Sequence, residues 1–356
     1  MPEVRSQGLA SIAAASATGG SDLWVASSYG SSGGLEAGAW WGAGGSYIGH
    51  LVGSRWSLWP VPLPPDAFIY GDDAFSSNPG SSLAGIYAAS DSDVWAVGQY
   101  EGTLGALPLI EHWNGKRWAV VKAPPAISAS YSGYSVAGVA GSGSKDVWAG
   151  GVLPADYAAD RFYFAMHWNG TSWRLASPTD SVDQVQAVAM SSPGDVWMVG
   201  YGSGAGGPAL IPIAYHWNGA QWNRTLIPQL SDNGMFETVT TLPGGEAWAA
   251  GQGIMARWNG RMWAAVPDQI ADAGPGDEVL GLAGTSANDV WAVGTADLSD
   301  NADIEHWNGR TWNLVLQYSS ASGVDQLRAV AASGRTVWAL GSGQPAPLIL
   351  RTTECR

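Results

Sequence analysis

The fold is decided by two short stretches that follow one another, DVWAVG at residues 93–98 and HWNGKRW at residues 112–118. The pair returns six more times, in close or degenerate copies that begin at Asp22, Asp146, Asp195, Glu246, Asp289 and Thr336. A repeat of about 40 to 50 residues is typical of a solenoid or a propeller. We therefore analyse the chain as one repeating unit before considering any single residue.

Each copy divides into four short strands. In the second copy, residues 83–88 are small and apolar, residues 93–98 form the next strand, and a third strand ends at residue 113. Asn114-Gly115 then separates two apolar runs, which is a strong signal for a tight hairpin. Four-stranded antiparallel units in series bury both faces of each sheet against their neighbours, and this predicts an all-β fold, a β-propeller.

The repeat leaves no room for a second domain, so we expect a single propeller over residues 1–356. The expected blades are seven, at residues 8–63, 83–124, 136–178, 185–228, 236–267, 279–317 and 327–356. The last copy stops after its third strand, at residues 348–351. We expect residues 1–7 to supply the missing strand, so that the N-terminal and C-terminal segments pair and no sheet edge stays open.

Of the 21 tryptophans, 18 occupy fixed places in the repeat. Seven lie on the second strands, at Trp24, Trp95, Trp148, Trp197, Trp248, Trp291 and Trp338. Eleven flank the turn between the third and fourth strands. Burying about 150 to 250 Å² per ring, at about 25 cal/mol per Å², gives a gross stabilisation of about 4 to 6 kcal/mol each. We therefore expect these rings in the core and not as platforms for sugars.

Charge and composition exclude several classes of function. A net charge of −14 repels nucleic acid and anionic lipid, so neither is expected as a partner. Cys355 is the only cysteine, which rules out an internal disulfide. No run of about 18 apolar residues occurs, and residues 1–20 lack the pattern of a signal peptide. We expect a monomer without a cofactor, and the compartment is not indicated.

The two motifs resemble those of the Trp-rich repeat propellers found in many bacterial, often exported, proteins. More distantly, the chain is similar to kelch, Asp-box and photosystem-assembly-factor-like propellers. The resemblance covers nearly the whole chain and implies the propeller fold, with export if this chain is a piece of a longer protein. Propellers serve as lectins, hydrolases, lyases and scaffolds, so the resemblance implies no particular activity.

All five histidines share one place in the repeat, and each has an acidic partner at the start of a second strand. The pairs are Asp22 with His50, Asp93 with His112, Asp146 with His167, Asp195 with His216, and Asp289 with His306. The copy with Glu246 in place of aspartate has Arg257 in place of histidine, as expected for a hydrogen-bonded ion pair. A catalytic pair is normally unique. We therefore predict that all six pairs are structural latches.

Length variation is confined to the loops on one rim, because the spacing from acid to base ranges from 28 residues (Asp22 to His50) to 11 (Glu246 to Arg257). Variable loops on a rigid scaffold are where binding usually occurs. This rim is acidic and aromatic, and an exposed tryptophan pair among glycines suits stacking on a sugar ring. The candidate ligand-binding residues in its two long loops are Trp40, Trp41, Phe68, Tyr70, Asp72 and Asp73.

Further candidates lie where the first strands begin. Asp183, Asp277 and Asp325 each precede a first strand by two residues, with Tyr134 at the equivalent place, and such carboxylates could converge on Ca²⁺ or a cationic ligand at the channel mouth. A second candidate metal loop carries Asp297, Asp300 and Asp303 but lacks the EF-hand glycine and glutamate. Along the first strands, the larger residues expected to line the channel are Gln186, Glu237 and Arg328.

These features favour a non-enzymatic binding or interaction module that presents its acidic, aromatic rim to a carbohydrate or a protein, and no catalytic residue is assigned. Two alternatives stay open. A propeller glycoside hydrolase or polysaccharide lyase would use rim carboxylates such as Asp72 and Asp277, which would have to lie about 5 to 10 Å apart. A structural or assembly scaffold would need no small ligand at all.

Overall fold

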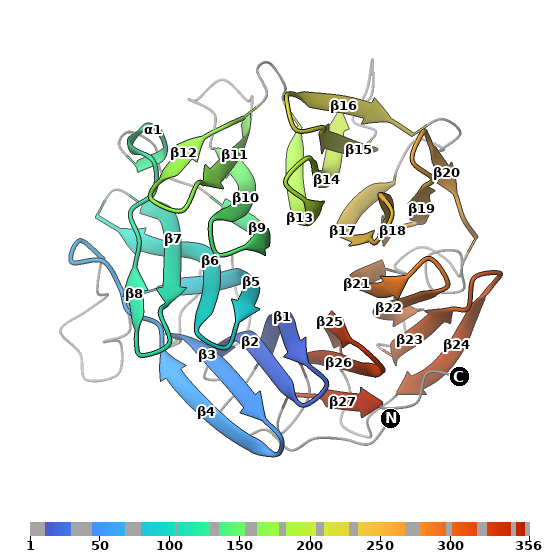
Figure 1. Cartoon of the computed structure of the whole chain (residues 1–356), viewed down its shortest axis with the longest axis horizontal. Coiled ribbons are helices and arrows are strands. Elements are labelled where there is room, and N and C mark those ends of the chain that lie inside the picture. The colour runs from blue at the N-terminus through green and yellow to red at the C-terminus, as the bar shows by residue number, and fades with distance from the viewer. Residues whose placement is uncertain are drawn as a thin grey trace, which may run out of the picture.

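The computed structural model describes residues 11–29, 45–67, 80–103, 105–128, 135–153, 162–177, 183–203, 210–227, 234–267, 278–296, 301–318, 326–342 and 347–352. Over these residues the chain forms 27 strands, β1 to β27, and one short helix, α1 (Pro125–Ser128). Figure 1 shows the strands grouped in sheets that radiate around a central opening. The fold is an all-β propeller of four-stranded antiparallel blades. No helix in the described part of the chain is long and apolar enough to span a membrane.

Four sheets contain four strands each, and we number them in chain order. The first holds β1 (Ser11–Gly19), β2 (Asp22–Tyr29), β3 (Gly45–Val52) and β4 (Arg55–Pro60), and the second holds β5 (Ser81–Ser90), β6 (Asp93–Gly102), β7 (Gly105–Trp113) and β8 (Trp118–Val120). The third holds β9 (Ser135–Gly143), β10 (Asp146–Leu153), β11 (Phe162–Trp168) and β12 (Trp173–Leu175). The fourth holds β13 (Gln184–Ser192), β14 (Asp195–Ser203), β15 (Leu210–Trp217) and β16 (Trp222–Leu226).

The remaining strands form one eight-stranded and one three-stranded sheet, so the separate blades are fewer than the seven expected. The larger sheet holds β17 (Met235–Leu242), β18 (Glu246–Gln252), β19 (Ile254–Trp258), β20 (Trp263–Ala265), β21 (Glu278–Ser286), β22 (Asp289–Ala296), β23 (Asn301–Trp307) and β24 (Trp312–Tyr318). Its two halves are joined through the single pair Gln252–Glu278. The smaller sheet holds β25 (Gln326–Ser333), β26 (Thr336–Ser342) and β27 (Ile349–Thr352). Its expected fourth strand, residues 1–7, lies outside the described residues.

The first and last sheets meet and close the ring (Figure 1). One apolar cluster contains Ile12 and Leu23 from the first sheet together with Trp338 and Ile349 from the last. The guanidinium of Arg351 also donates to the main-chain carbonyl of Gly20 in the β1–β2 turn. Packing between sheets therefore brings the two ends of the described chain together.

The second-strand tryptophans are buried, as the sequence predicts, with Trp95 fully inaccessible and Trp148 at 3% exposure. Each of the first four reaches across to the turn-flanking tryptophans of the next sheet in the ring, and the fifth, Trp248, reaches those of the other half of the eight-stranded sheet. Trp95 lies 4.9 Å from Trp168 and 5.4 Å from Trp173 between ring centroids, the latter edge to face. Aromatic rings prefer such tilted contacts, and they recur at five junctions.

The glycine that ends DVWAVG has a steric cause. Most first strands carry a β-bulge beside it, as between Phe236 and Thr238. A Cβ on Gly251 would lie 2.2 Å from the carbonyl oxygen of Met235, and one on Gly200 would lie 1.8 Å from that of Gln184. Only glycine allows so close an approach of two backbones.

Candidate functional site

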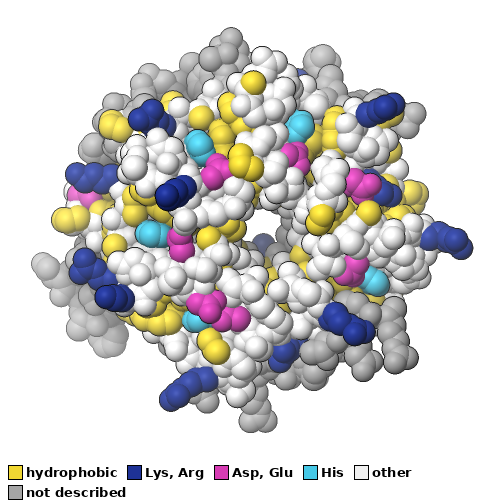
Figure 2. All heavy atoms as spheres, viewed as in Figure 1, with side chains coloured by type: hydrophobic (Ala, Val, Ile, Leu, Met, Phe, Trp, Pro, Cys, Tyr) yellow, Lys and Arg dark blue, Asp and Glu magenta, His cyan; other side chains and the backbone are white. Residues whose placement is uncertain are grey.

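The five Asp–His pairs predicted from the sequence all meet in the structure. Each histidine Nε2 lies 2.7 to 2.9 Å from the partner Oδ1. The aspartate starts a second strand and the histidine is near the end of a third, opposite the second-strand tryptophan, as in the pair Trp95–His112. The imidazole stacks on that tryptophan with ring centroids 3.8 to 4.5 Å apart. In Figure 2, histidine and acidic side chains surround the central opening, and lysine and arginine lie farther out.

The substituted pair keeps this geometry. One guanidinium nitrogen of Arg257 lies 3.0 Å and 2.9 Å from the two carboxylate oxygens of Glu246. The guanidinium lies 5.6 Å from the ring centroid of Trp248, so it takes the place of the stacked imidazole. That the six pairs stabilise the fold and take no part in catalysis stays a prediction.

Three of the aspartates also bind a hydroxyl group four residues earlier. Ser142 donates to Oδ2 of Asp146 at 2.6 Å, and Ser191 and Thr285 do the same to Asp195 and Asp289. In a Ser-His-Asp catalytic triad, the imidazole lies between the hydroxyl and the carboxylate and removes the hydroxyl proton. Here the carboxylate lies between the other two groups, so the imidazole does not activate the hydroxyl.

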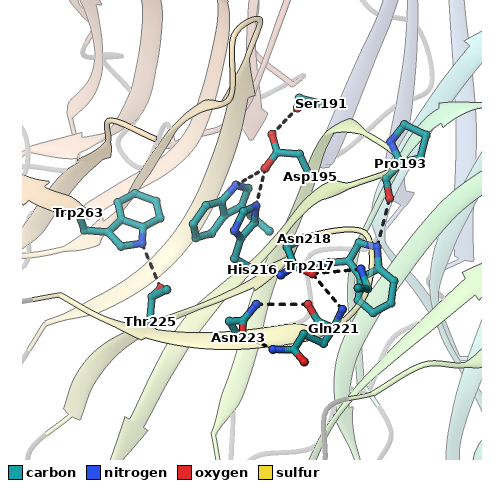
Figure 3. A network of polar contacts seen from close by, with 12 residues as sticks. Ser191, Pro193, Asp195, His216, Trp217, Asn218, Gln221, Asn223, Thr225 and Trp263 are labelled. Atoms are coloured by element: carbon teal, nitrogen blue, oxygen red, sulfur yellow. Dashed lines mark hydrogen bonds and ion pairs between the residues drawn. The ribbon is translucent and has the colours of Figure 1, made fainter. Parts of the chain in front are cut away.

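Asp195 has three side-chain hydrogen-bond partners (Figure 3), and Asp289 has the corresponding three. Burial alone would raise its pKa, but hydrogen bonds from His216 and Ser191, with a further one from Trp197 Nε1 at 3.0 Å, outweigh burial and lower the pKa below its ordinary value. The carboxylate is therefore ionised at neutral pH.

A surface hollow of about 480 Å³ opens beside this carboxylate. It lies between the fourth sheet and the β17–β18 turn, and it is lined by Ser191, Ser192, Gly194, Asp195, His216, Pro243, Gly244, Gly245, Trp258 and Gly260. The aromatic wall is Trp258, whose ring centroid lies 5.0 Å from that of the buried Trp197. Aspartate, imidazole and indole thus face one space.

The hollow occurs where the repeat departs from its pattern. In four other copies, the tryptophan that ends the third strand donates its Nε1–H to the carbonyl of a residue in the preceding turn, as Trp217 does to Pro193 at 3.2 Å. The β17–β18 turn has three residues between its paired ends, Leu242 and Glu246, where the β13–β14 turn has two. Within the described residues, Trp258 Nε1 donates to no acceptor.

Most of the rim residues predicted to bind a ligand lie outside the described residues. These are Trp40, Trp41, Phe68, Tyr70, Asp72, Asp73, Tyr134, Asp277 and Asp325, and the same holds for Asp297 and Asp300 of the candidate metal loop. For all of them the sequence-based prediction stands untested.

Asp183 does not lie open at the channel mouth, as the carboxylate ring required. Its side chain is buried. The Nε–H and Nη2–H groups of Arg224 donate hydrogen bonds to its two carboxylate oxygens, at 2.9 Å and 3.2 Å. The hydroxyl of Tyr215 donates to the same carboxylate. A bidentate guanidinium and a phenol already satisfy this group, so a ligand-binding role does not suit it.

Asp303 was expected in a loop, but it lies within β23, where it pairs with Gly294 and Gln317, and it is 3% exposed.

The channel prediction concerned the first strands β13, β17 and β25, which border the central opening in Figure 1. Their bulges place Gln186, Glu237 and Arg328 as the extra residues. Burial, assisted by the nearby charge of Glu278 and opposed by Arg328, raises the pKa of Glu237 to about 7.

Sequence reasoning missed the hollow beside Trp258. The signal that could have revealed it is the turn Pro243-Gly244-Gly245. Among the described turns between a first and a second strand, it is the only one with three residues where the others have two. Both glycines have positive φ, +101° and +83°, so the longer turn depends on them.

Comparison with known proteins supports the fold and leaves the activity open. No protein-family model matches the chain, and no curated protein sequence matches it. A catalytically inactive virginiamycin B lyase from Staphylococcus aureus, solved with quinupristin, has a similar structure, with a TM-score of 0.60 and 11% identity over 99% of this chain and 98% of that chain. The chain is a Trp-rich β-propeller.

Two further propellers illustrate how different the matched proteins are. The WD40 propeller domain of Doa1 gives a TM-score of 0.57 at 11% identity, covering 99% of this chain and 96% of that chain. A ulvan lyase from a new family of polysaccharide lyases gives 0.56 at 10% identity, covering 98% of both chains. At these identities the likeness concerns the fold alone.

Proposed function

We propose that this propeller is a non-enzymatic binding module of seven blades, related to the Trp-rich repeat propellers whose motifs it shares. The eight-stranded sheet would count as two blades, because a single residue pair joins its halves. The three-stranded sheet would be the seventh blade, completed by residues 1–7. Such a ring holds its surface groups rigidly, which lowers the entropic cost of binding.

The ligand we propose is a neutral carbohydrate, bound in the hollow beside Trp258. The observation that carries this proposal is the Nε1–H of Trp258, which has no acceptor among the described residues. In four other copies the equivalent tryptophan donates this N–H to a turn carbonyl, as Trp217 does to Pro193. A sugar ring offers an apolar face for the indole and hydroxyl groups that accept from Nε1–H and donate to the Asp195 carboxylate. The volume of about 480 Å³ suits a ligand of this size.

Charge favours a neutral ligand over an anionic one. Asp195 is ionised and the chain carries a net charge of −14, so an acidic sugar would be repelled. Hydrolysis finds little support here, because Asp195 is the one carboxylate among the residues that line the hollow. Most glycosidases need two carboxyl groups on opposite sides of the scissile bond.

The experiment is to titrate the full chain with a panel of neutral oligosaccharides and to measure binding by calorimetry and thermal unfolding. Trp258→Phe keeps the aromatic wall and removes the donor, so we expect affinity to fall about two- to tenfold, the value of one hydrogen bond. Trp217→Phe is the matched control, because that indole donates to Pro193 and lines no part of the hollow, and its affinity should equal that of the wild type.

Equal affinity in wild type and Trp258→Phe would place the sugar elsewhere, with the rim loops as the next candidates. If no oligosaccharide binds, the carbohydrate proposal fails and a protein partner becomes the leading alternative. A ligand consumed during the titration would point instead to the rival enzymatic reading.

A further inference from the structure

One of the five Asp–His pairs has a third potential metal ligand beside it. The carboxylate of Asp91, from the β5–β6 turn of the second sheet, approaches Asp22 and His50 of the first sheet. One ligand atom from each residue lies within 4.8 Å of the other two, and His50 Nε2 is 2.9 Å from Asp22 Oδ1. It is the one such cluster of histidine and carboxylate groups among the described residues.

The repeat explains why this junction is unique. The residue at the place of Asp91 lies two positions before the start of the second strand, and in four copies its carbonyl accepts the indole N–H of the third-strand tryptophan. In the other copies that residue is Ser144, Pro193 or Ala287. None of these side chains is a carboxylate, so the neighbouring pairs Asp93–His112, Asp146–His167 and Glu246–Arg257 have no third ligand from this position.

Surrounding contacts support two of the three ligands, Asp91 and His50. Thr18 Oγ1 donates to Asp91 Oδ1 at 2.8 Å, and Trp113 Nε1 donates to the Asp91 carbonyl at 3.0 Å. The His50 imidazole stacks on Trp24 with centroids 3.8 Å apart and planes at 10°. Hydrogen bonds and packing around the ligands are the usual support of a metal site.

Accessibility also suits an ion that enters from solvent. The side chains of His50 and Asp22 are 12% and 16% exposed, whereas Asp91 is exposed. The two inner ligands are thus fixed by burial, and the outer one can rotate toward an ion.

We propose that Asp22, His50 and Asp91 bind a divalent transition metal ion of the zinc type, which links the first and second sheets. One imidazole nitrogen and two carboxylate oxygens form a donor set that Zn²⁺ accepts, with water in the remaining position. Ca²⁺ prefers six to eight oxygen ligands, so it should bind poorly. Two ligand atoms at about 2.1 Å from one ion are at most about 4.2 Å apart, whereas the present ligand atoms lie within 4.8 Å of one another. A small rotation of the Asp91 side chain would bring its carboxylate within the shorter distance. His50 binds the ion as a neutral imidazole through the lone pair of Nε2, with its one proton on Nδ1.

The test measures binding and thermal unfolding of the full chain, freed of metal by a chelator, with Zn²⁺, Co²⁺ and Ca²⁺. We expect one Zn²⁺ per chain and a higher melting temperature with Zn²⁺ than with Ca²⁺, because an ion bound only by the folded state stabilises it. Co²⁺ should give the visible absorption of an ion with nitrogen and oxygen ligands. Absence of any Zn²⁺ binding to the wild type would overturn the proposal.

Asp91→Asn is the variant that decides between this site and unspecific binding at the other histidines. The residue is exposed, so the metal-free variant should melt at the wild-type temperature, whereas Zn²⁺ affinity should fall at least tenfold. Unchanged affinity and stoichiometry in Asp91→Asn would overturn the assignment.

A gain of binding can be tested at the next junction. Ser144→Asp places a carboxylate beside the pair Asp93–His112 in the same register, so we expect a second Zn²⁺ per chain. Ser144→Asn is the matched control, with one Zn²⁺ expected. A Ser144→Asp variant that still binds a single ion would contradict the geometric argument on which the site rests.

Discussion

At the scale of single residues, the glycine that ends the DVWAVG motif in six of the seven copies is set by the backbone of the neighbouring strand, whereas the first copy has Ser27 there. The motif could be identified from the sequence, but the reason why its last residue is glycine could not. The bulge in the first strand brings a carbonyl oxygen to within 1.8 Å of where a Cβ of Gly200 would be. A bulge is a pairing between two strands, and the spacing of residues along one strand does not reveal it.

Gly200→Ala should therefore destabilise the propeller by about 2 to 4 kcal/mol, because the methyl group meets backbone that has no room to move. Urea unfolding followed by tryptophan fluorescence would measure the change. Gly194→Ala is the control, since its nearest neighbours lie 3.7 Å or more away, and its unfolding free energy should change by less than about 1 kcal/mol. Similar losses in both variants would contradict the steric explanation.

Glu111 provides a second prediction at this scale. Its side chain is fully buried on β7 opposite Ala96 and Val120, and neither carboxyl oxygen has a hydrogen-bond partner within the described residues. Burial raises its pKa to about 8. The folded state thus holds this proton more tightly than the unfolded state, so stability should fall as pH rises from about 4.5 through 8.

In Glu111→Gln this fall should be absent, so the variant should gain stability relative to wild type between pH 6 and 9. Urea unfolding at a series of pH values would measure it. Parallel stability profiles for the two proteins would show that Glu111 does not titrate in this range.

At the scale of strands and turns, the sequence predicted the hairpins well. The Asn-Gly signal placed the third and fourth strands as antiparallel neighbours, and β7 and β8 pair in this way. Asn114 Oδ1 accepts from the main-chain N–H groups of Lys116 and Arg117, and Gly115 has φ of +83°. Such local contacts are encoded within a few residues. The hollow beside Trp258 was not predictable, because it depends on a hydrogen bond that a turn 13 residues earlier fails to supply.

The latch between second and third strands can be tested by exchange. Glu246→Asp shortens the acid opposite Arg257, and Arg257→His shortens the base opposite Glu246, so each single variant should lose about 1 to 2 kcal/mol. The double variant recreates the common Asp–His pair and should recover most of that loss. Urea unfolding of the four proteins gives the coupling energy, and strictly additive losses would mean that the pair is no latch.

At the scale of the whole molecule, the repeat period predicted the propeller, because every sheet buries its faces against its neighbours. The sequence predicted that the ring must close, because an open array would leave exposed sheet edges. It could not show which residues make the contact, since these come from the two ends of the chain. The structure supplies one part, the packing of the first sheet on the last through Ile12, Trp338 and their neighbours. The pairing of residues 1–7 with the last sheet stays a prediction.

Deletion of residues 1–7 should lower the melting temperature by several degrees, because β27 would keep β26 as its one partner and the last sheet would have an open edge. Calorimetry of the shortened and full chains would measure the difference. Replacement of the same residues by a glycine-serine segment of equal length separates the effect of pairing from that of length. An unchanged melting temperature in both variants would show that the ring closes without them.

The tilted tryptophan contacts between neighbouring sheets have an optical consequence. Indole pairs with centroids 4.9 to 5.9 Å apart recur at five junctions of the ring. At such separations the excited states of two indoles couple, and excitation passes between them before light is emitted. We therefore expect the emission of the folded chain to be depolarised and its far-ultraviolet circular dichroism to carry exciton bands. Both signals should weaken when the sheets part, because only pairs within one sheet, such as Trp113 and Trp118 at 5.8 Å, would remain, so the protein contains its own spectroscopic reporter of an intact ring.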